Sequence, residues 1–112
     1  MRKTANELWA DACQLEENGK LDEAIKAYES AVAAGSVEAM ISLANIYDDQ
    51  LTPPKSEEAT LLYAKAAALG NSLGAWNLYR HFLNLGDNAN ARIWLKTAAK
   101  LGDEDAMKLI RK

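Results

Sequence analysis

The sequence has almost no cysteine, histidine or proline. Cys13 is the one cysteine in 112 residues, and His81 is the one histidine. A lone cysteine excludes an intramolecular disulfide and a multi-cysteine metal site. General acid–base catalysis and zinc binding need further histidine or carboxylate partners, which the sequence does not place near His81. We therefore predict no metal site and no cofactor, and we expect that the protein is not an enzyme.

Excess positive charge and long hydrophobic runs are missing as well. The formal net charge is −3, whereas phosphate-backbone binding needs clustered Lys and Arg, so nucleic acid is not an expected partner. No stretch has the roughly 20 apolar residues of a membrane span. The polar sequence Thr4-Ala5-Asn6-Glu7 stands where a secretory signal would have its apolar run. We expect a cytoplasmic protein without a membrane segment.

Alanine is abundant, and three alanine-rich segments of twelve residues repeat one another. They are AIKAYESAVAAG (24–35), ATLLYAKAAALG (59–70) and ARIWLKTAAKLG (91–102). Their final glycines are 35 and then 32 residues apart, which is typical of solenoid repeats built from helix pairs. The shared Ala, large and Ala positions are spaced by four and three residues and so lie on one helix face. Each glycine is predicted to end its helix in the left-handed conformation.

The segments that follow these glycines also share a pattern. A small residue lies four positions beyond each glycine and a large one eight beyond: Ala39, Gly74 and Ala106, then Leu43, Leu78 and Ile110. Thr52-Pro53-Pro54 interrupts the helical pattern, because the residue before a proline is disfavoured in a helix. The pattern predicts seven helices, at about 4–18, 21–34, 36–50, 56–69, 71–85, 88–101 and 103–111.

These repeats resemble a known family. Leu62-Tyr63, Ala66-Ala67 and Gly70, repeated as Trp94-Leu95, Ala98-Ala99 and Gly102, look like Sel1-like repeats, which are relatives of tetratricopeptide repeats. The first hairpin is similar to a tetratricopeptide unit at Leu8, Ala12, Leu15, Gly19, Ala24, Tyr28 and Ala31. The resemblance implies an all-α fold, a right-handed α-solenoid of antiparallel helix pairs with three hairpins and a C-terminal capping helix. It implies one domain over 1–112, with repeats at about 4–35, 36–70 and 71–102 and a cap at 103–112.

Family members use the concave surface, lined by the first helix of each pair, to bind peptides or proteins. A stripe one residue beyond the core positions, turned by about 100°, supplies the candidate residues on these first helices. The candidates are Trp9, Cys13, Ile41, Asn45, Asp48, Trp76, Arg80, Leu83 and Lys108, with Lys112 continuing the polar column. We predict an adaptor that binds a protein or peptide segment in this groove. Trp9 and Trp76 would anchor the segment, Asn45 would bond its backbone and Arg80 would pair with an acidic group.

Alternatives to this assignment remain open. Tryptophans at helical spacing also suit a protein interior, so Trp9 and Trp76 either face a partner or pack between helices. Trp94 is predicted to belong to the core. The ends of the stack, around Leu8, Met107 and Ile110, offer a second function, that of a homo-oligomeric structural module. The charged outer face of the last helix favours a finished monomer over such a homodimer.

Overall fold

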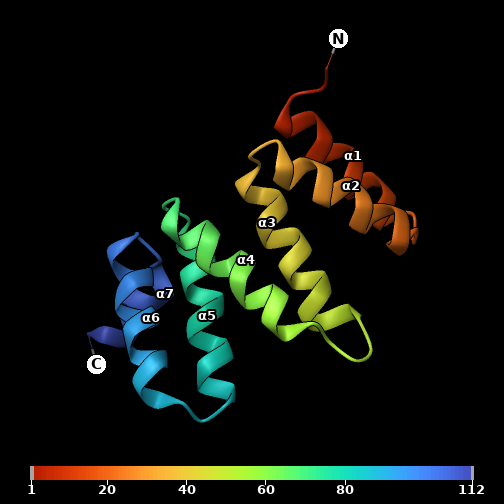
Figure 1. The fold of residues 1–112 in the computed structure, drawn as a ribbon. Helices are drawn as coiled ribbons and strands as arrows, with labels where there is room; N and C mark the ends of the chain where they lie inside the picture. The colour runs from red at the N-terminus through yellow and green to blue at the C-terminus, as the bar shows by residue number, and fades with distance from the viewer. Residues whose placement is uncertain (1, 112) are drawn as a thin grey trace. The chain divides into compact units, whose positions relative to one another are not determined.

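The computed structural model describes residues 2–111 and contains helices and no strand among them. Figure 1 shows the helices, and within each of the two compact units described below consecutive helices pack as antiparallel neighbours. They are α1 (Ala5–Glu17), α2 (Leu21–Ala33), α3 (Val37–Asn45), α4 (Ser56–Ala68), α5 (Ser72–Asn84), α6 (Asn88–Lys100) and α7 (Glu104–Ile110). The all-α fold and the seven helices predicted from the repeats are therefore confirmed.

The third helix differs from its prediction in its last turn. It was expected to continue as an α-helix to residue 50, but α3 ends at Asn45 and a π-helix, η1 (Ile46–Gln50), follows it directly. The backbone then becomes extended at Leu51, and the Tyr47 carbonyl accepts a hydrogen bond from the Lys55 amide at 2.8 Å. This bond to the loop replaces the bond that a further α-helical turn would supply.

The chain divides into two compact units, residues 1–59 and residues 60–112. The boundary between them falls inside α4. The first unit holds α1, α2, α3 and η1, and the second holds α5, α6 and α7. The assignment of one domain to residues 1–112 stays a prediction.

The predicted small positions form the core of the first unit. Here α1 packs on α2, and α2 packs on α3. Ala12, Ala24, Ala31 and Ala39 have no exposed surface, and Tyr28 is buried among the helices. Because a buried alanine keeps the neighbouring backbone close, these positions set the distance between the helices.

Small residues likewise bring together the helices of the second unit. Ala67, Ala75, Ala98 and Ala106 form a buried cluster, against which partly buried larger side chains pack: Trp76, Trp94, Leu95 and Leu101. A Cβ atom on Gly74 would lie 2.6 Å from the Tyr63 carbonyl oxygen, so α5 approaches α4 too closely there for any side chain. Trp94 thus packs against the core, as predicted, while keeping part of its surface exposed.

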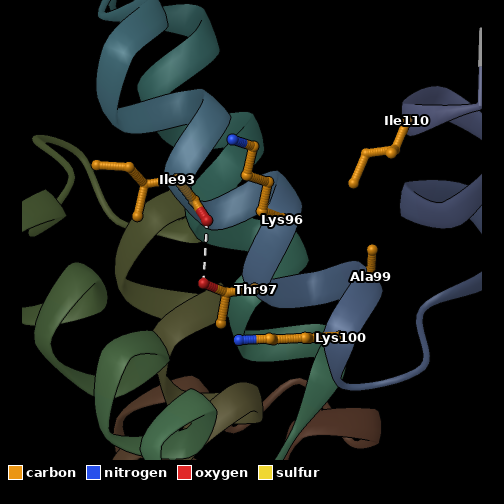
Figure 2. A pocket seen from close by; sticks show the side chains of 6 residues that line it. All are labelled: Ile93, Lys96, Thr97, Ala99, Lys100 and Ile110. Atoms are coloured by element: carbon orange, nitrogen blue, oxygen red, sulfur yellow. Dashed lines mark hydrogen bonds between the residues drawn. The ribbon is translucent and has the colours of Figure 1, made fainter.

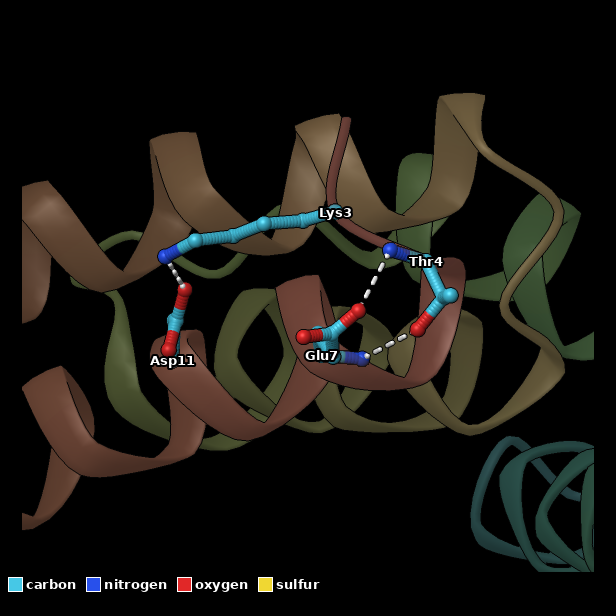
Figure 3. Close-up of polar contacts among 4 residues, drawn as sticks. All are labelled: Lys3, Thr4, Glu7 and Asp11. Atoms are coloured by element: carbon cyan, nitrogen blue, oxygen red, sulfur yellow. Dashed lines mark hydrogen bonds and ion pairs between the residues drawn. The ribbon is translucent and has the colours of Figure 1, made fainter. Parts of the chain in front are cut away.

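Helix ends follow local sequence. Gly35, Gly70 and Gly102 have φ values of +96°, +93° and +100°, which confirms the left-handed helix stops. At the start of α1, the Thr4 hydroxyl accepts from the Glu7 amide at 3.1 Å, and the Thr4 amide donates to a Glu7 carboxylate oxygen at 3.0 Å (Figure 3). These two bonds form a capping box. The bond from the Thr4 amide to the carboxylate, followed by the Thr4 side chain, lowers the pKa of Glu7, because hydrogen bonding to the carboxylate favours its charged form.

An exposed ion pair lies beside this cap. Lys3, which precedes α1, donates to the carboxylate of Asp11 in the middle of that helix (Figure 3). The hydrogen bond to Asp11 and the attraction of its charge raise the pKa of Lys3.

Within the described part of the chain, no helix is both long enough and apolar enough to span a bilayer.

Candidate protein-binding site

Trp9 joins the first helices of the first two repeats. Its indole nitrogen on α1 donates to the Ser42 hydroxyl on α3 at 3.1 Å. The indole N–H is therefore already satisfied, and Trp9 remains partly exposed. What Trp9 can offer to a partner is the apolar surface of its ring.

A hydrogen-bonded cluster surrounds Cys13 in the first unit. The Tyr28 hydroxyl donates to the Glu16 carboxylate at 2.6 Å and lies 3.4 Å from the Cys13 sulfur. The Gln50 side chain in η1 donates to the other Glu16 oxygen at 2.9 Å. Burial, followed by these contacts with Cys13 and Glu16, raises the pKa of Tyr28. The cluster ties α1, α2 and η1 together, so Glu16 and Tyr28 have structural partners.

The candidate residues on α3 and η1 are also largely engaged. Ile41 is 7% exposed, which places most of its side chain in the core. Asn45 is half-buried and has interactions within the protein. Asp48 accepts a hydrogen bond from the Ser56 hydroxyl at 3.4 Å. Ile41 therefore offers a partner little free surface, and the Asn45 and Asp48 side chains already have interactions within the protein.

The α5 residues carry the most accessible part of the candidate site. Trp76 packs on the alanine cluster with one part and remains partly exposed with another. Its ring lies 5.1 Å from the Tyr79 ring at a tilt of 42°. Arg80 is exposed, and Leu83 is 46% exposed. We call these four residues, Trp76, Tyr79, Arg80 and Leu83, the α5 face.

The other predicted positions are less informative. Lys108 is an exposed residue of α7, in the same unit as the α5 face, and Lys112 lies outside the described residues. His81 is half-buried and contacts the Phe82 ring edge-on at 5.3 Å. Residues 2–111 contain no group of three or more His, Cys, Asp or Glu side chains that could hold a metal ion.

The candidates divide between the two units. Trp9, Cys13, Ile41, Asn45 and Asp48 belong to the first unit, and Trp76, Arg80, Leu83 and Lys108 to the second. The continuous groove through all repeats stays a prediction. Sequence reasoning missed Tyr79, although its position three residues after Trp76 on a helix gives a direct sign of their contact.

A second surface feature was also missed. An open groove of about 610 Å³ lies beside α6 and α7, and six residues line it: Ile93, Lys96, Thr97, Ala99, Lys100 and Ile110. We call it the α6–α7 groove (Figure 2). The Thr97 hydroxyl donates to the Ile93 carbonyl at 2.9 Å, which occupies its one donor. The repeat pattern assigns Ile110, eight residues after Gly102, to an apolar position, but its exposure of 46% follows only from the structure.

Comparison with known protein families gives no matching family model, and comparison with curated proteins gives no match. The helical-repeat arrangement therefore rests on the structure and on the repeated sequence itself.

Proposed function

We propose that this protein is an adaptor of the Sel1-like or tetratricopeptide-like kind, which binds a peptide or protein segment on the first helices of its repeats. The α5 face supports this proposal most directly. It combines an aromatic pair, an arginine and an exposed leucine on one helix of the second unit. Aromatic and arginine side chains are the commonest anchors of protein interfaces.

The charge at this face favours an acidic partner group. Arg80 forms no ion pair with any residue from 2 to 111, so its guanidinium is available for a bidentate bond to a carboxylate. Leu83 and the exposed part of Trp76 supply apolar surface on the same helix. We therefore infer a ligand segment with a carboxylate next to a large apolar side chain.

Selection from a random peptide display library tests the proposal without a known partner. We expect the selected peptides to be enriched in Asp or Glu beside an aromatic or aliphatic residue. Arg80→Glu should weaken binding by about tenfold or more, as expected for an interface arginine. Isothermal titration of one selected peptide measures the loss.

Lys65→Glu provides the matched control. Lys65 is an exposed lysine on α4, so the substitution makes the same change in net charge outside the α5 face. We expect it to leave the affinity within about twofold of the wild type, because the effect of an exposed charge that does not contact the ligand is screened by salt. Equal losses in both variants, or no selected peptide that responds to Arg80, would refute the proposed site.

A further inference from the structure

The α6–α7 groove lies where the repeat pattern predicts a helix contact. Ile110 stands eight residues after its glycine, as do Leu43 and Leu78 in the preceding repeats. Leu43 is 3% exposed and Leu78 is fully buried, but Ile110 is 46% exposed. The same position is thus covered in two repeats and open in the third.

A second position in the groove shows the same difference. Ala99 and Ala67 both lie three residues before a repeat glycine. Ala67 is buried in the cluster with Ala98 and Ala106, whereas Ala99 is only partly buried. In Figure 2, Ile110 extends from α7 toward α6, and Ala99 lies on the α6 side. Among the described residues, no further helix covers these two side chains.

The shape of a fitting occupant follows from α6 itself. In the second unit, α6 packs on α5. Ala98 belongs to the buried cluster with Ala75, Leu95 packs against that cluster, and Ala91 is buried as well. Ala91, Leu95 and Ala98 are spaced by four and three, so they form one apolar helix face. A helix with the same small, large and small spacing matches the Ala99 and Ile110 surface, because equivalent surfaces accept equivalent helices in stacked repeats.

The charge of the groove selects among such helices. Lys96 and Lys100, one turn apart on α6, line it and form no ion pair with residues 2–111. The nearest acidic side chains on α7, Glu104 and Asp105, are in its first turn and do not line the groove. Carboxylates on an incoming helix would therefore be attracted to the rim of the groove.

A second copy of this chain does not supply both an apolar helix face and carboxylates to the groove. Pairing two α6–α7 grooves would bring Lys96 and Lys100 of both copies together, which is repulsive. Residues 1–59 hold five Lys and Arg against twelve Asp and Glu, a formal charge of −7, so they supply carboxylates. However, all the exposed large hydrophobic side chains among the described residues lie between 61 and 110. Residues 1–59 of a second copy could therefore supply the carboxylates but not the exposed apolar side chains that the groove requires.

We propose that the α6–α7 groove binds an acidic amphipathic helix of a partner protein. Its apolar side chains contact Ala99 and Ile110, and its carboxylates pair with Lys96 and Lys100. This surface is separate from the α5 face, so it would give the adaptor a second binding site.

A designed helical peptide serves as the probe. It has about 14 residues, or four turns, with Ala, Leu and Ala at positions i, i+4 and i+7 and Glu at the flanking positions. A second peptide carries Lys in place of each Glu. Isoleucine methyl NMR is suited to the measurement, because Ile25, Ile41 and Ile46 belong to the first unit whereas Ile93 and Ile110 line the groove.

We expect the acidic peptide to shift the Ile93 and Ile110 signals and to leave the other three in place. The basic peptide should bind at least about tenfold more weakly, because it opposes two lysines. Lys96→Glu/Lys100→Glu should reverse this preference. Lys26→Glu/Lys65→Glu, which makes the same net charge change at two exposed lysines elsewhere, should retain it.

Three results would overturn the proposal. The first is the absence of shifts at Ile93 and Ile110 with the acidic peptide at about 1 mM, where even weak protein contacts are populated. The second is equal binding of the two peptides by the wild type. The third is a shift of these signals with protein concentration alone, which would show that a second copy occupies the groove. The Arg80→Glu variant should bind the acidic peptide normally, so failure here is distinguishable from failure at the α5 face.

Discussion

At the scale of single residues, the alanines and Gly74 determine how closely the helices approach. A Cβ atom at position 74 would lie 2.6 Å from the Tyr63 carbonyl oxygen and 3.0 Å from the Ala67 amide nitrogen. Both are backbone atoms, so relief requires a movement of α5 relative to α4. The equivalent residues Ala39 and Ala106 are fully buried, which shows that those repeats have room for one methyl group.

Gly74→Ala should therefore destabilise the protein, although alanine is the better helix former. The gain in helix propensity is about 1 kcal/mol, and overpacking of a close contact costs about 1–3 kcal/mol. Since the clash is with backbone, we expect a net loss of about 1 kcal/mol in the free energy of unfolding. Urea denaturation measures it. Unchanged or higher stability would show that α4 and α5 separate easily.

Tyr28 gives a prediction for alkaline pH. Burial, followed by the contacts with Cys13 and Glu16, raises its pKa above the usual 10.0. In the unfolded chain this tyrosine loses its proton near pH 10, while in the folded protein it keeps it. The folded state then binds more protons, so stability present below pH 10 is lost as the pH rises.

Tyr28→Phe should reduce this pH dependence. Above pH 10, we expect the slope of unfolding free energy against pH to become shallower. The change should correspond to a difference of about one bound proton between the folded and unfolded states. Tyr47, whose pKa is also raised by burial and then by Glu29, supplies a remaining slope. Urea denaturation at a series of pH values tests this, and identical slopes in the variant and the wild type would contradict it.

Residue roles were predictable from the sequence where they depend on local spacing. The buried alanines and the left-handed glycines follow from a repeated pattern and are found as expected. The bond between Gln50 and Glu16 joins residues 34 positions apart, and no local pattern encodes such a pair. The exposure of Ile110 was equally hidden, because it depends on what covers the helix rather than on the helix itself.

At the scale of helices, side-chain caps mark the starts of α1, α3, α5, α6 and α7, whereas α2 begins without one. Asp103 precedes α7, and its carboxylate accepts from the Ala106 amide at 2.9 Å. Only seven residues make up α7, and a helix this short has few internal hydrogen bonds to compensate for a lost cap. By contrast, no side-chain cap marks the start of η1, since Ile46–Gln50 continues α3 without a break. This explains why the helix starts were predictable and the π-helix was not.

Asp103→Ala should therefore loosen α7 selectively. We expect a loss of about 1 kcal/mol for the missing cap and faster amide hydrogen exchange at residues 104–110. Asp103→Asn is the control, because its side-chain oxygen can still accept the Ala106 amide. Similar exchange rates in the Ala and Asn variants would show that the side-chain cap does not hold α7.

At the scale of the whole molecule, the two units differ in charge and share one helix. Residues 60–112 hold eight Lys and Arg against four Asp and Glu, a formal charge of +4, opposite in sign to that of residues 1–59. The unit boundary lies between Ala59 and Thr60, within α4. Since helix formation is cooperative along the chain, the order of one part of α4 favours the order of the other.

This continuity leads us to expect one cooperative unfolding transition. Leu78 is fully buried in the second unit, and Leu78→Ala should cost about 2–4 kcal/mol by leaving a cavity. In a Trp76→Phe/Trp94→Phe background, Trp9 alone reports fluorescence from the first unit. In the Leu78→Ala variant, the urea midpoint of the Trp9 fluorescence should fall by the same amount as the midpoint measured by circular dichroism, which reports all the helices. The reason is that neighbouring repeats stabilise one another. A Trp9 transition that stays in place would mean that α4 can melt at the boundary and that each unit folds by itself.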